Sequence, residues 1–248
     1  MSDRIAFVAG ASGSLGPTLC RSLAAEGFSV VAHAHSNGGA VDGIVDSLDG
    51  DHLAVVGELA SDDGPSEPVS RAIERFGRVD VLVNAAHPPW RSAAQVADLS
   101  LGDLSDQLTG VVTHAAVCRD VLPSMRSSGG GRIVFVAGAL MRRPAAGFSA
   151  YGAAKAAAAT LTRYIALEEG RYGITANIVA PGRIVDPNEP EDIPPDKQQL
   201  AEELRRRLAL GAFPSPDDVA NTIVSLVRHE GRALTGQTVW VTGGEPIE

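Results

Sequence analysis

Short apolar runs alternate with longer segments of helical periodicity along the whole chain. The runs are 5–9, 29–34, 53–56, 79–83, 132–137, 175–179 and 238–241, and the helical patterns lie at about 15–26, 39–48, 63–76, 101–125, 150–169, 198–208 and 216–229. The runs are rich in Val and Ile and apolar on both faces, which is typical of parallel strands covered by helices on both sides. This alternation predicts an α/β fold with a Rossmann-like, doubly wound sheet of seven mostly parallel strands and right-handed crossovers.

The chain contains no linker that would divide it. The Gly/Ser-rich stretch 127–131 separates a helical pattern from the next apolar run and is typical of a turn. One irregular stretch, 183–196, contains four prolines and five acidic residues, and a loop of this length in a compact domain is usually functional or mobile. We therefore expect a single domain over residues 1–248, with a mobile segment at about 183–210.

Composition and charge narrow the function classes. The 248 residues include 21 Lys and Arg against 30 Asp and Glu, a formal net charge of −9, and 44% are hydrophobic. A chain of this composition is not intrinsically disordered, and its acidic balance argues against nucleic acid as a partner. No apolar run approaches the roughly 20 residues that cross a membrane, and the N-terminus has no signal-peptide pattern. We expect a cytoplasmic protein without membrane contact.

Cysteine and histidine spacing gives no indication of a metal site. Cys20 and Cys118 fit neither a disulfide framework nor a zinc pattern, and we interpret both as buried free thiols. His33 and His35 lack a third ligand. Alternation along an edge of the sheet is the simpler interpretation of that pair.

A glycine-rich turn joins the first strand to the first helix. Its sequence is Ala9-Gly10-Ala11-Ser12-Gly13-Ser14-Leu15-Gly16. Glycines let the backbone approach a pyrophosphate, and the N-terminus of the following helix directs N–H groups and a positive dipole at it. The position of the loop after strand one predicts a dinucleotide site.

With this loop the sequence begins to resemble the short-chain dehydrogenase/reductase family, whose fingerprint is T-G-x-x-x-G-x-G. Gly10 and Gly16 match it, whereas Ala9 and Ser14 replace the threonine and the middle glycine. Further family motifs follow in order: Asn84-Ala85-Ala86, Tyr151-Gly152-Ala153-Ala154-Lys155, Pro181-Gly182, and Leu234-Thr235-Gly236-Gln237 with Gly243-Gly244. The resemblance covers the whole chain and implies an NAD(P)(H)-dependent oxidoreductase that interconverts a carbonyl and an alcohol on a small or medium organic substrate.

The stretch after strand two bears on the choice of cofactor. NAD-binding folds carry an Asp or Glu there for the ribose 2′-OH, but residues 32–37 (AHAHSN) contain neither an acid nor Arg or Lys. NADP(H) is therefore favoured, with His35 and Ser36 at the 2′-phosphate, and NAD(H) stays open. The resemblance implies a cofactor site formed by Gly10, Ser12, Ser14, Leu15, Gly16, His35, Ser36, Glu58, Leu59, Asn84, Ala85, Tyr151, Lys155, Pro181, Gly182 and Ile184.

Tyr151 and Lys155 are four residues apart on a predicted helix and so share a face. A phenol is a poor base at neutral pH, and a nearby ammonium group favours the phenolate and lowers the pKa of the phenol. The resemblance implies that Tyr151 is the general acid/base and that Lys155 lowers its pKa and holds the nicotinamide ribose.

Several positions depart from the family pattern. The substrate-positioning serine, 13 residues before the tyrosine, is Gly138 here, and its neighbour Ala137 offers no hydroxyl either. Gln107 stands for the helix-four asparagine of the proton relay, and we expect it to keep a relay water in a shifted place. Asp186 stands where a threonine often contacts the carboxamide, and a carboxylate cannot donate as that hydroxyl does.

Loss of one preorganised hydrogen-bond donor to the reacting oxygen typically lowers the catalytic rate by about 10²–10³. Three interpretations of the missing serine remain open. A donor from elsewhere replaces the serine: Ser149, His87 or Ser92. The substrate brings its own donor or needs less polarisation. Alternatively, the chain keeps the scaffold without standard redox chemistry, as a non-redox catalyst or a partner subunit.

The remaining candidates concern the substrate pocket and assembly. His87, Trp90, Gly138 and Ser149 are expected to line the pocket, and the resemblance implies that the segment at about 183–210 covers it. The arginines at 142–143 are either solvated or meet an acidic substrate. Small residues on the helical pattern 150–169 fit the family's pairing of two helices across a two-fold axis, which implies a homodimer or homotetramer.

Overall fold

The computed structural model describes residues 4–61, 64–90, 93–187, 198–228 and 233–245. Seven parallel strands form one sheet in the order β3-β2-β1-β4-β5-β6-β7, which confirms the predicted fold class. The strands are β1 Arg4–Ala9, β2 Phe28–Ala34, β3 Leu53–Val56, β4 Val81–Asn84, β5 Gly131–Val136, β6 Ile174–Pro181 and β7 Thr238–Val241. The α-helices are α1 Gly16–Ala25, α2 Gly38–Asp46, α3 Glu67–Phe76, α4 Leu101–Ser127, α5 Ser149–Glu169, α6 Gln198–Arg207 and α7 Pro216–Val227, with short 3₁₀ turns η1 Val96–Asp98, η2 Ala139–Met141 and η3 Gly170–Tyr172.

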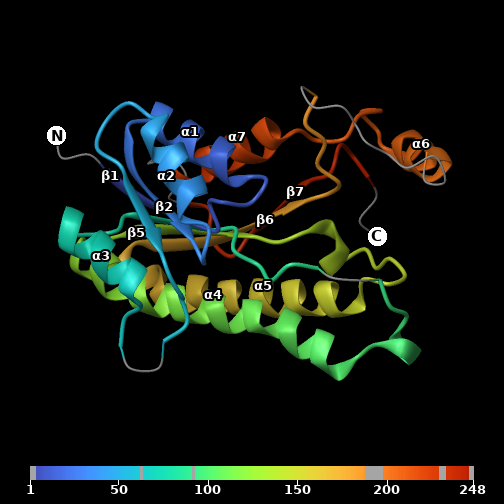
Figure 1. Ribbon diagram of the computed structural model, residues 1–248, viewed down its shortest axis with the longest axis horizontal. Helices are drawn as coiled ribbons and strands as arrows, with labels where there is room; N and C mark the ends of the chain where they lie inside the picture. The colour runs from blue at the N-terminus through green and yellow to red at the C-terminus, as the bar shows by residue number, and fades with distance from the viewer. Residues whose placement is uncertain (1–3, 62–63, 91–92, 188–197, 229–232, 246–248) are drawn as a thin grey trace.

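Helices cover both faces of the sheet (Figure 1). α1, α2 and α7 pack on one face through a core that includes Leu19, Ile44 and Ile223. α3, α4 and α5 pack on the other through a core that includes Val69 and Val121. Successive residues of β1 to β4 alternate between the two cores, and β5, β6 and β7 also contribute to a third cluster that includes Phe135 and Ile178. This is why the strands are apolar on both faces.

The strand order reverses between β1 and β4, which lie side by side in the sheet although two strands separate them along the chain. In an open parallel sheet, ligands bind outside the carboxyl ends of the strands at such a switch point. The fold therefore directs attention to the loops that follow Ala9 and Asn84.

Element boundaries differ from the predicted ones by a few residues at most. The largest difference is α3, which begins at Glu67 instead of residue 63, because Ser66 has an extended backbone and Pro68 occupies the first turn. Asp62 and Asp63 lie outside the described residues. Pro216 opens α7 as expected, next to a capping box between Ser215 and Asp218.

Both cysteines are free and buried, as predicted, and burial raises the pKa of the Cys20 thiol to about 12. Within the described part of the chain, no helix combines the length and the apolar character needed to cross a bilayer. The same residues contain no cluster of His, Cys, Asp and Glu side chains that could hold a metal ion.

Candidate active site

The loop between β1 and α1 is built so that only glycine fits at two positions. Gly10 has a φ of +78°, and a Cβ there would lie 2.7 Å from the backbone of Ala86. A Cβ on Gly16 would lie 1.8 Å from the carbonyl oxygen of Ala11. Gly10 therefore lets the end of β1 approach the residues that follow β4, and Gly16 lets the start of α1 fold back on Ala11.

This loop fits a pyrophosphate group. Ser12, Gly13 and Ser14 are exposed, and no described residue accepts a hydrogen bond from the backbone amides of Ser12, Ser14 or Leu15. The first turn of α1 carries no acidic side chain and no side-chain cap. Free amides at the positive end of a helix are the groups that bind phosphate.

His33 supports the loop from β2, a role that the sequence did not reveal. Its Nδ1 accepts a hydrogen bond from the Gly10 amide at 3.3 Å, and its Nε2 lies 2.9 Å from the carbonyl oxygen of Gly57. These two bonds require the neutral Nε2–H form, and burial lowers the pKa of His33. β2 lies inside the sheet, between β3 and β1, so alternation along a sheet edge was the wrong interpretation.

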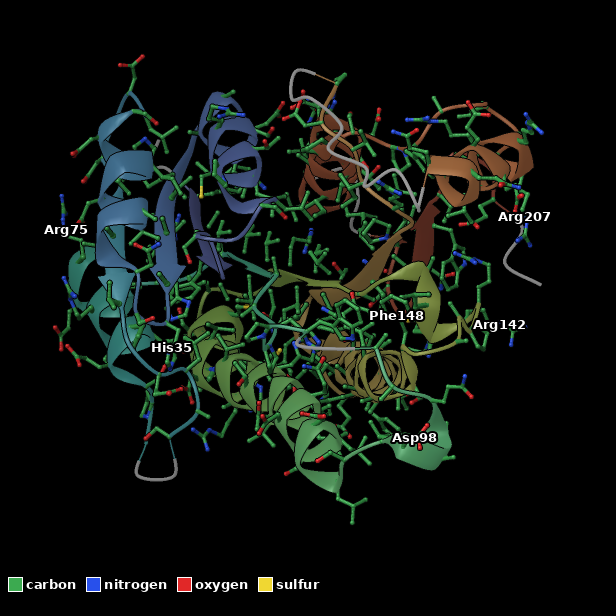
Figure 2. All side chains as sticks on the ribbon, turned by 45° about the vertical axis from the view of Figure 1, so that its right-hand side comes forward. His35, Arg75, Asp98, Arg142, Phe148 and Arg207 are labelled. Atoms are coloured by element: carbon green, nitrogen blue, oxygen red, sulfur yellow. The ribbon has the colours of Figure 1, made fainter. Side chains whose placement is uncertain are left out.

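A cavity of about 740 Å³ extends from His35 and Ser36 past Glu58 and Leu59 to His87. Four of the residues expected to form the cofactor site, His35, Ser36, Glu58 and Leu59, thus line one cavity. The exposed side chains of His35 and Glu58 bond to each other, Nε2 to Oε1 at 2.5 Å. Figure 2 shows His35 well apart from Phe148, the residue that directly precedes α5.

Asn84 is fully buried at the end of β4. Its Oδ1 accepts the Ala86 amide and its Nδ2 donates to Nδ1 of His114, whose Nε2 donates to Oγ1 of Thr162. Burial, with a smaller effect of the Lys155 charge, lowers the pKa of His114 to about 3. This neutral chain of bonds ties β4 to α4 and α5 and shapes the turn at Ala85, whose amide donates to Ala9.

Tyr151 and Lys155 lie in the first two turns of α5 and face the carboxyl end of β5. Lys155 is buried, its Nζ donates to the Val136 carbonyl at 2.9 Å, and it lies 5.7 Å from the centre of the Tyr151 ring. Burial lowers the pKa of Lys155 to about 7 and raises the pKa of Tyr151. In the structure the phenol is therefore held protonated, which differs from the lowered pKa expected from an adjacent ammonium group.

The hydroxyl of Tyr151 lies against Gly138, where the family carries its serine. A Cβ built on Gly138 would be 2.9 Å from this hydroxyl. The phenol therefore occupies part of the space that a serine side chain would need.

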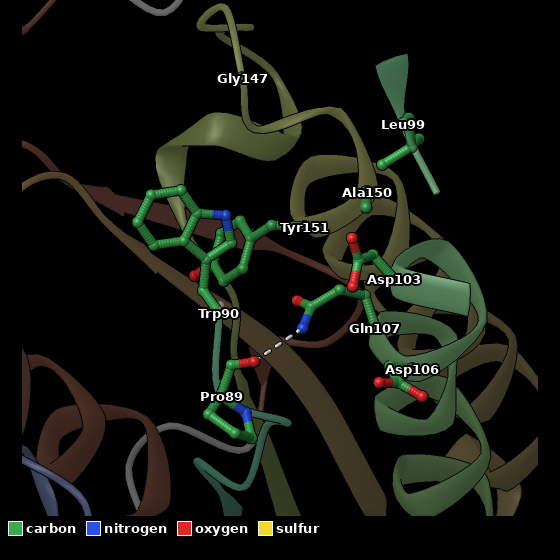
Figure 3. A pocket seen from close by; sticks show the side chains of 9 residues that line it. All are labelled: Pro89, Trp90, Leu99, Asp103, Asp106, Gln107, Gly147, Ala150 and Tyr151. Carbon is green, nitrogen blue, oxygen red and sulfur yellow. Dashed lines mark hydrogen bonds between the residues drawn. The ribbon is translucent and has the colours of Figure 1, made fainter. Parts of the chain in front are cut away.

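His87 and Gln107 also lie beside Tyr151. The His87 ring meets the Tyr151 ring edge to face, with centroids 5.0 Å apart, and its Nε2 bonds to Oε1 of Gln107 at 2.9 Å. The Gln107 amide also donates to the Pro89 carbonyl at 3.2 Å, as Figure 3 shows. Burial, and then the Lys155 charge, lower the pKa of His87 to about 4.

A small cavity of about 20 Å³ lies between Trp90, Gln107 and Tyr151, with Asp103 at its wall (Figure 3). This is room for about one water-sized group. Trp90 stacks on Phe148 with ring centroids 4.7 Å apart. Trp90 therefore forms part of the wall of this small cavity.

Ser149 is turned away from this cavity. It lines a separate cavity of about 630 Å³ on the other side of α5, and its buried hydroxyl has no hydrogen-bond partner in the described structure. Residues two apart on a helix do not share a face, so Ser149 and Tyr151 point in different directions. Ser92 lies outside the described residues.

The remaining predicted residues lie at the end of β6. Pro181 ends the strand, the Gly182 amide donates to Val241, and Ile184 packs against the core. Of the predicted covering segment, residues 188–197 lie outside the described residues.

Arg143 is not simply solvated, because its Nη2 lies 3.0 Å from Oε2 of the buried Glu245.

Gly110 is a further residue that sequence reasoning missed. It lies inside α4, and a Cβ there would be 2.9 Å from Nδ1 of His87. Glycine inside a helix is unfavourable by about 1 kcal/mol relative to alanine, so an internal glycine three residues after Gln107 was a signal of close packing.

The sequence and the fold are both similar to those of known oxidoreductases. Residues 10–245 match the family model described as Enoyl-(Acyl carrier protein) reductase. The chain is 30% identical to the short-chain reductase protein NovJ of Streptomyces niveus, covering 98% of this chain and 94% of that protein. It is 31% identical to the 7alpha-hydroxysteroid dehydrogenase of Bacteroides fragilis, covering 99% and 95%. The crystal structure of an acetoin dehydrogenase from Enterobacter cloacae matches with a TM-score of 0.83 at 27% identity, covering 98% of this chain and 96% of that one.

Proposed function

Because the chain belongs to the short-chain dehydrogenase/reductase family, we propose that it interconverts a carbonyl and an alcohol on a small or medium organic substrate, with NADP(H) and with Tyr151 as the proton donor. The observation that carries the proposal is the placement of Tyr151 and Lys155. Both lie on one face of α5 beside the carboxyl end of β5. His87, which packs on the Tyr151 ring, also lines the cavity that contains His35, Ser36 and Glu58.

The protonation state of Tyr151 suits reduction. Burial raises the pKa of this phenol, so at neutral pH it holds a proton that it can donate to a carbonyl oxygen. A nicotinamide cofactor supplies or accepts the hydride when it is bound. In the reverse direction Tyr151 takes the proton from the alcohol, and a charged Lys155 beside it stabilises the phenolate.

Other residues would hold the cofactor. The backbone amides of Ser12, Ser14 and Leu15 would bind the pyrophosphate, and Lys155 would donate to the ribose hydroxyls. His35 and Ser36 would meet a 2′-phosphate. NADP(H) is favoured because no acid follows β2, and because Glu58, the nearby carboxylate, is already bonded to His35.

The test uses purified protein with NADPH or NADH and a panel of carbonyl compounds that includes diacetyl and cyclohexanone. We expect oxidation of NADPH, and Tyr151→Phe should lower kcat by about 10²–10⁴ because it removes the acid/base group. Cofactor affinity, followed by tryptophan fluorescence, should be retained. Tyr164→Phe, an exposed tyrosine on the same helix, is the matched control and should behave as wild type. Full activity of Tyr151→Phe would refute the proton role, and tighter binding of NADH would refute the cofactor preference.

A second function has one observation in its favour. Gly138 leaves no hydroxyl at the usual place, as expected of a family scaffold that catalyses a non-redox step or serves as a partner subunit. Absence of any Tyr151-dependent oxidation of NADPH or NADH across the panel would favour it.

We also propose that the protein self-associates through α4 and α5. These helices carry the exposed apolar side chains of Val112, Tyr164 and Leu167, and homo-oligomers commonly bury such patches across two-fold axes. Light scattering should give a mass of two or four chains, and a monomer at micromolar concentration would contradict this.

A further inference from the structure

Four residues follow one another across the site, each in contact with the next: Gly110, His87, Tyr151 and Gly138. A Cβ on Gly110 would lie 2.9 Å from Nδ1 of His87 and 3.0 Å from Cδ of Pro88. The His87 and Tyr151 rings are 5.0 Å apart at an interplanar angle of 87°. A Cβ on Gly138 would lie 2.9 Å from the Tyr151 hydroxyl. The two rings thus fill the space that side chains at the two glycines would need.

Neither glycine is required by its backbone. Gly138 has φ −173° and ψ 149°, an extended conformation open to any residue. Gly110 lies inside α4, where alanine would be more favourable by about 1 kcal/mol. What both positions provide is room, at Gly110 for the His87 ring and at Gly138 for the Tyr151 hydroxyl.

We propose that His87 is a positioning residue that holds the Tyr151 hydroxyl against Gly138, so that one hydroxyl both orients the substrate oxygen and donates the proton, in place of the missing serine. This inference rests on the proposed function and identifies how the same site works without its customary second hydroxyl.

Gln107 fixes His87 in this place. Its Oε1 accepts from Nε2–H of His87, and its own amide is anchored on the Pro89 carbonyl. Gln107 is buried, so the carboxamide has little freedom to turn. The His87 ring is uncharged at neutral pH, because burial lowers its pKa to about 4. It therefore packs on Tyr151 without drawing the proton from the phenol.

The arrangement makes the effect of a serine at position 138 depend on His87. Ordinary contact begins near 3.4 Å, so a Cβ at 2.9 Å requires the Tyr151 hydroxyl to move by about 0.5 Å. The Tyr151 ring also meets His87, and His87 in turn occupies the space that a side chain on Gly110 would need. With His87 present the phenol is displaced or strained, and with His87 removed it can retreat.

The experiment compares Gly138→Ser, His87→Ala and the double variant, with diacetyl and NADPH as the probe pair. Gly43→Ser is the matched control, since that helical glycine is exposed and a Cβ there meets nothing within 4 Å. Gly138→Ser should lower kcat by about 10- to 100-fold, the scale of a small misplacement of a reacting group. His87→Ala should lower kcat by about tenfold, and adding Gly138→Ser to it should cause no further loss.

Two further readouts separate positioning from a general structural defect. The cofactor Kd of Gly138→Ser should stay within about threefold of wild type, so that the loss falls on kcat. A crystal structure of Gly138→Ser should show the Tyr151 hydroxyl displaced from its place beside residue 138.

The proposal is overturned if the losses from Gly138→Ser and His87→Ala simply multiply, if Gly138→Ser raises kcat, or if the serine variant shows an unmoved Tyr151. A failure of the proposed function looks different: neither wild type nor any variant would oxidise NADPH with the probe in a Tyr151-dependent manner. In that case the proposed role of His87 fails together with the proposed function.

Discussion

Replacing Lys155 by methionine should stabilise the protein at neutral pH while it removes activity. Lys155 is only 4% exposed, and among the residues that the structure describes its Nζ donates one hydrogen bond, to the Val136 carbonyl. Its surroundings offer the Phe135 ring at 5.0 Å and the Tyr151 ring at 5.7 Å. Aromatic faces attract a cation only weakly compared with water or a carboxylate, so the ammonium group is poorly compensated.

The lowered pKa of Lys155 sets the size of the expected gain in the free energy of unfolding. Burial lowers the pKa of Lys155 from 10.5 to about 7, which corresponds to about 5 kcal/mol of destabilisation when the pH is below the folded value. Between these two pKa values the unfolded chain binds more protons, so the free energy of unfolding rises with pH, and the cost vanishes above the unfolded pKa. Methionine keeps the packing of the stem but leaves the Val136 carbonyl without its donor, at about 1 kcal/mol. The net gain near neutral pH is therefore on the order of 2–4 kcal/mol.

The assay is urea unfolding of wild type and Lys155→Met at about pH 6.5 and pH 10.5. The variant should be the more stable protein at the lower pH and equal to or slightly less stable than wild type at the higher pH. Arg163→Met, an exposed cation on the same helix, is the control and should show no such change of sign. A variant that is equally destabilised at both pH values would refute the idea that the buried, charged amine of Lys155 destabilises the folded protein.

Three other substitutions test the geometry. Gly16→Ala places a Cβ 1.8 Å from the Ala11 carbonyl oxygen, so thermal melting should reveal a loss on the order of 3 kcal/mol or more, and a wild-type Tm would contradict the turn. Gln107→Glu sets a carboxylate against Nε2 of His87, so the pKa of His87 should rise from about 4, and an unmoved midpoint in an NMR titration would show that the pair does not form. Gly110→Ala should lower kcat by about tenfold by displacing His87, while the added helix propensity limits any fall in Tm. Unchanged kinetics would count against that displacement.

The fold could be predicted because the signal repeats in every unit of the chain. Strands such as β1 send Ala6 and Val8 to one core and Phe7 to the other, and only a doubly covered sheet needs that pattern. The start of α3 was missed because acidic residues before Ser66 also suit a helical first turn. The extended backbone of Ser66 and the proline in the first helical turn decided the boundary.

Only part of the candidate site could be predicted from the sequence. Spacing identifies which helix face a residue occupies, so Tyr151 and Lys155 could be paired from sequence, and the same rule argues against Ser149. Spacing does not identify which side chain fills a gap left by glycine. The contact of His87 with Tyr151 depends on space at Gly110 and Gly138, and these lie on elements that only the folded chain brings together.

Burial acts on Tyr151, Lys155 and His87 in the same sense, toward the uncharged form. It raises the pKa of Tyr151, lowers that of Lys155 to about 7 and lowers that of His87 to about 4. A protonated phenol in such surroundings is ready to give its proton to a developing alkoxide. Taking a proton from an alcohol first requires a phenolate, and the fraction of phenolate grows about tenfold for each pH unit below the pKa. Oxidation of an alcohol should therefore accelerate with rising pH much more steeply than reduction of the matching carbonyl slows, and equal pH profiles in the two directions would show that Tyr151 does not titrate as its burial requires.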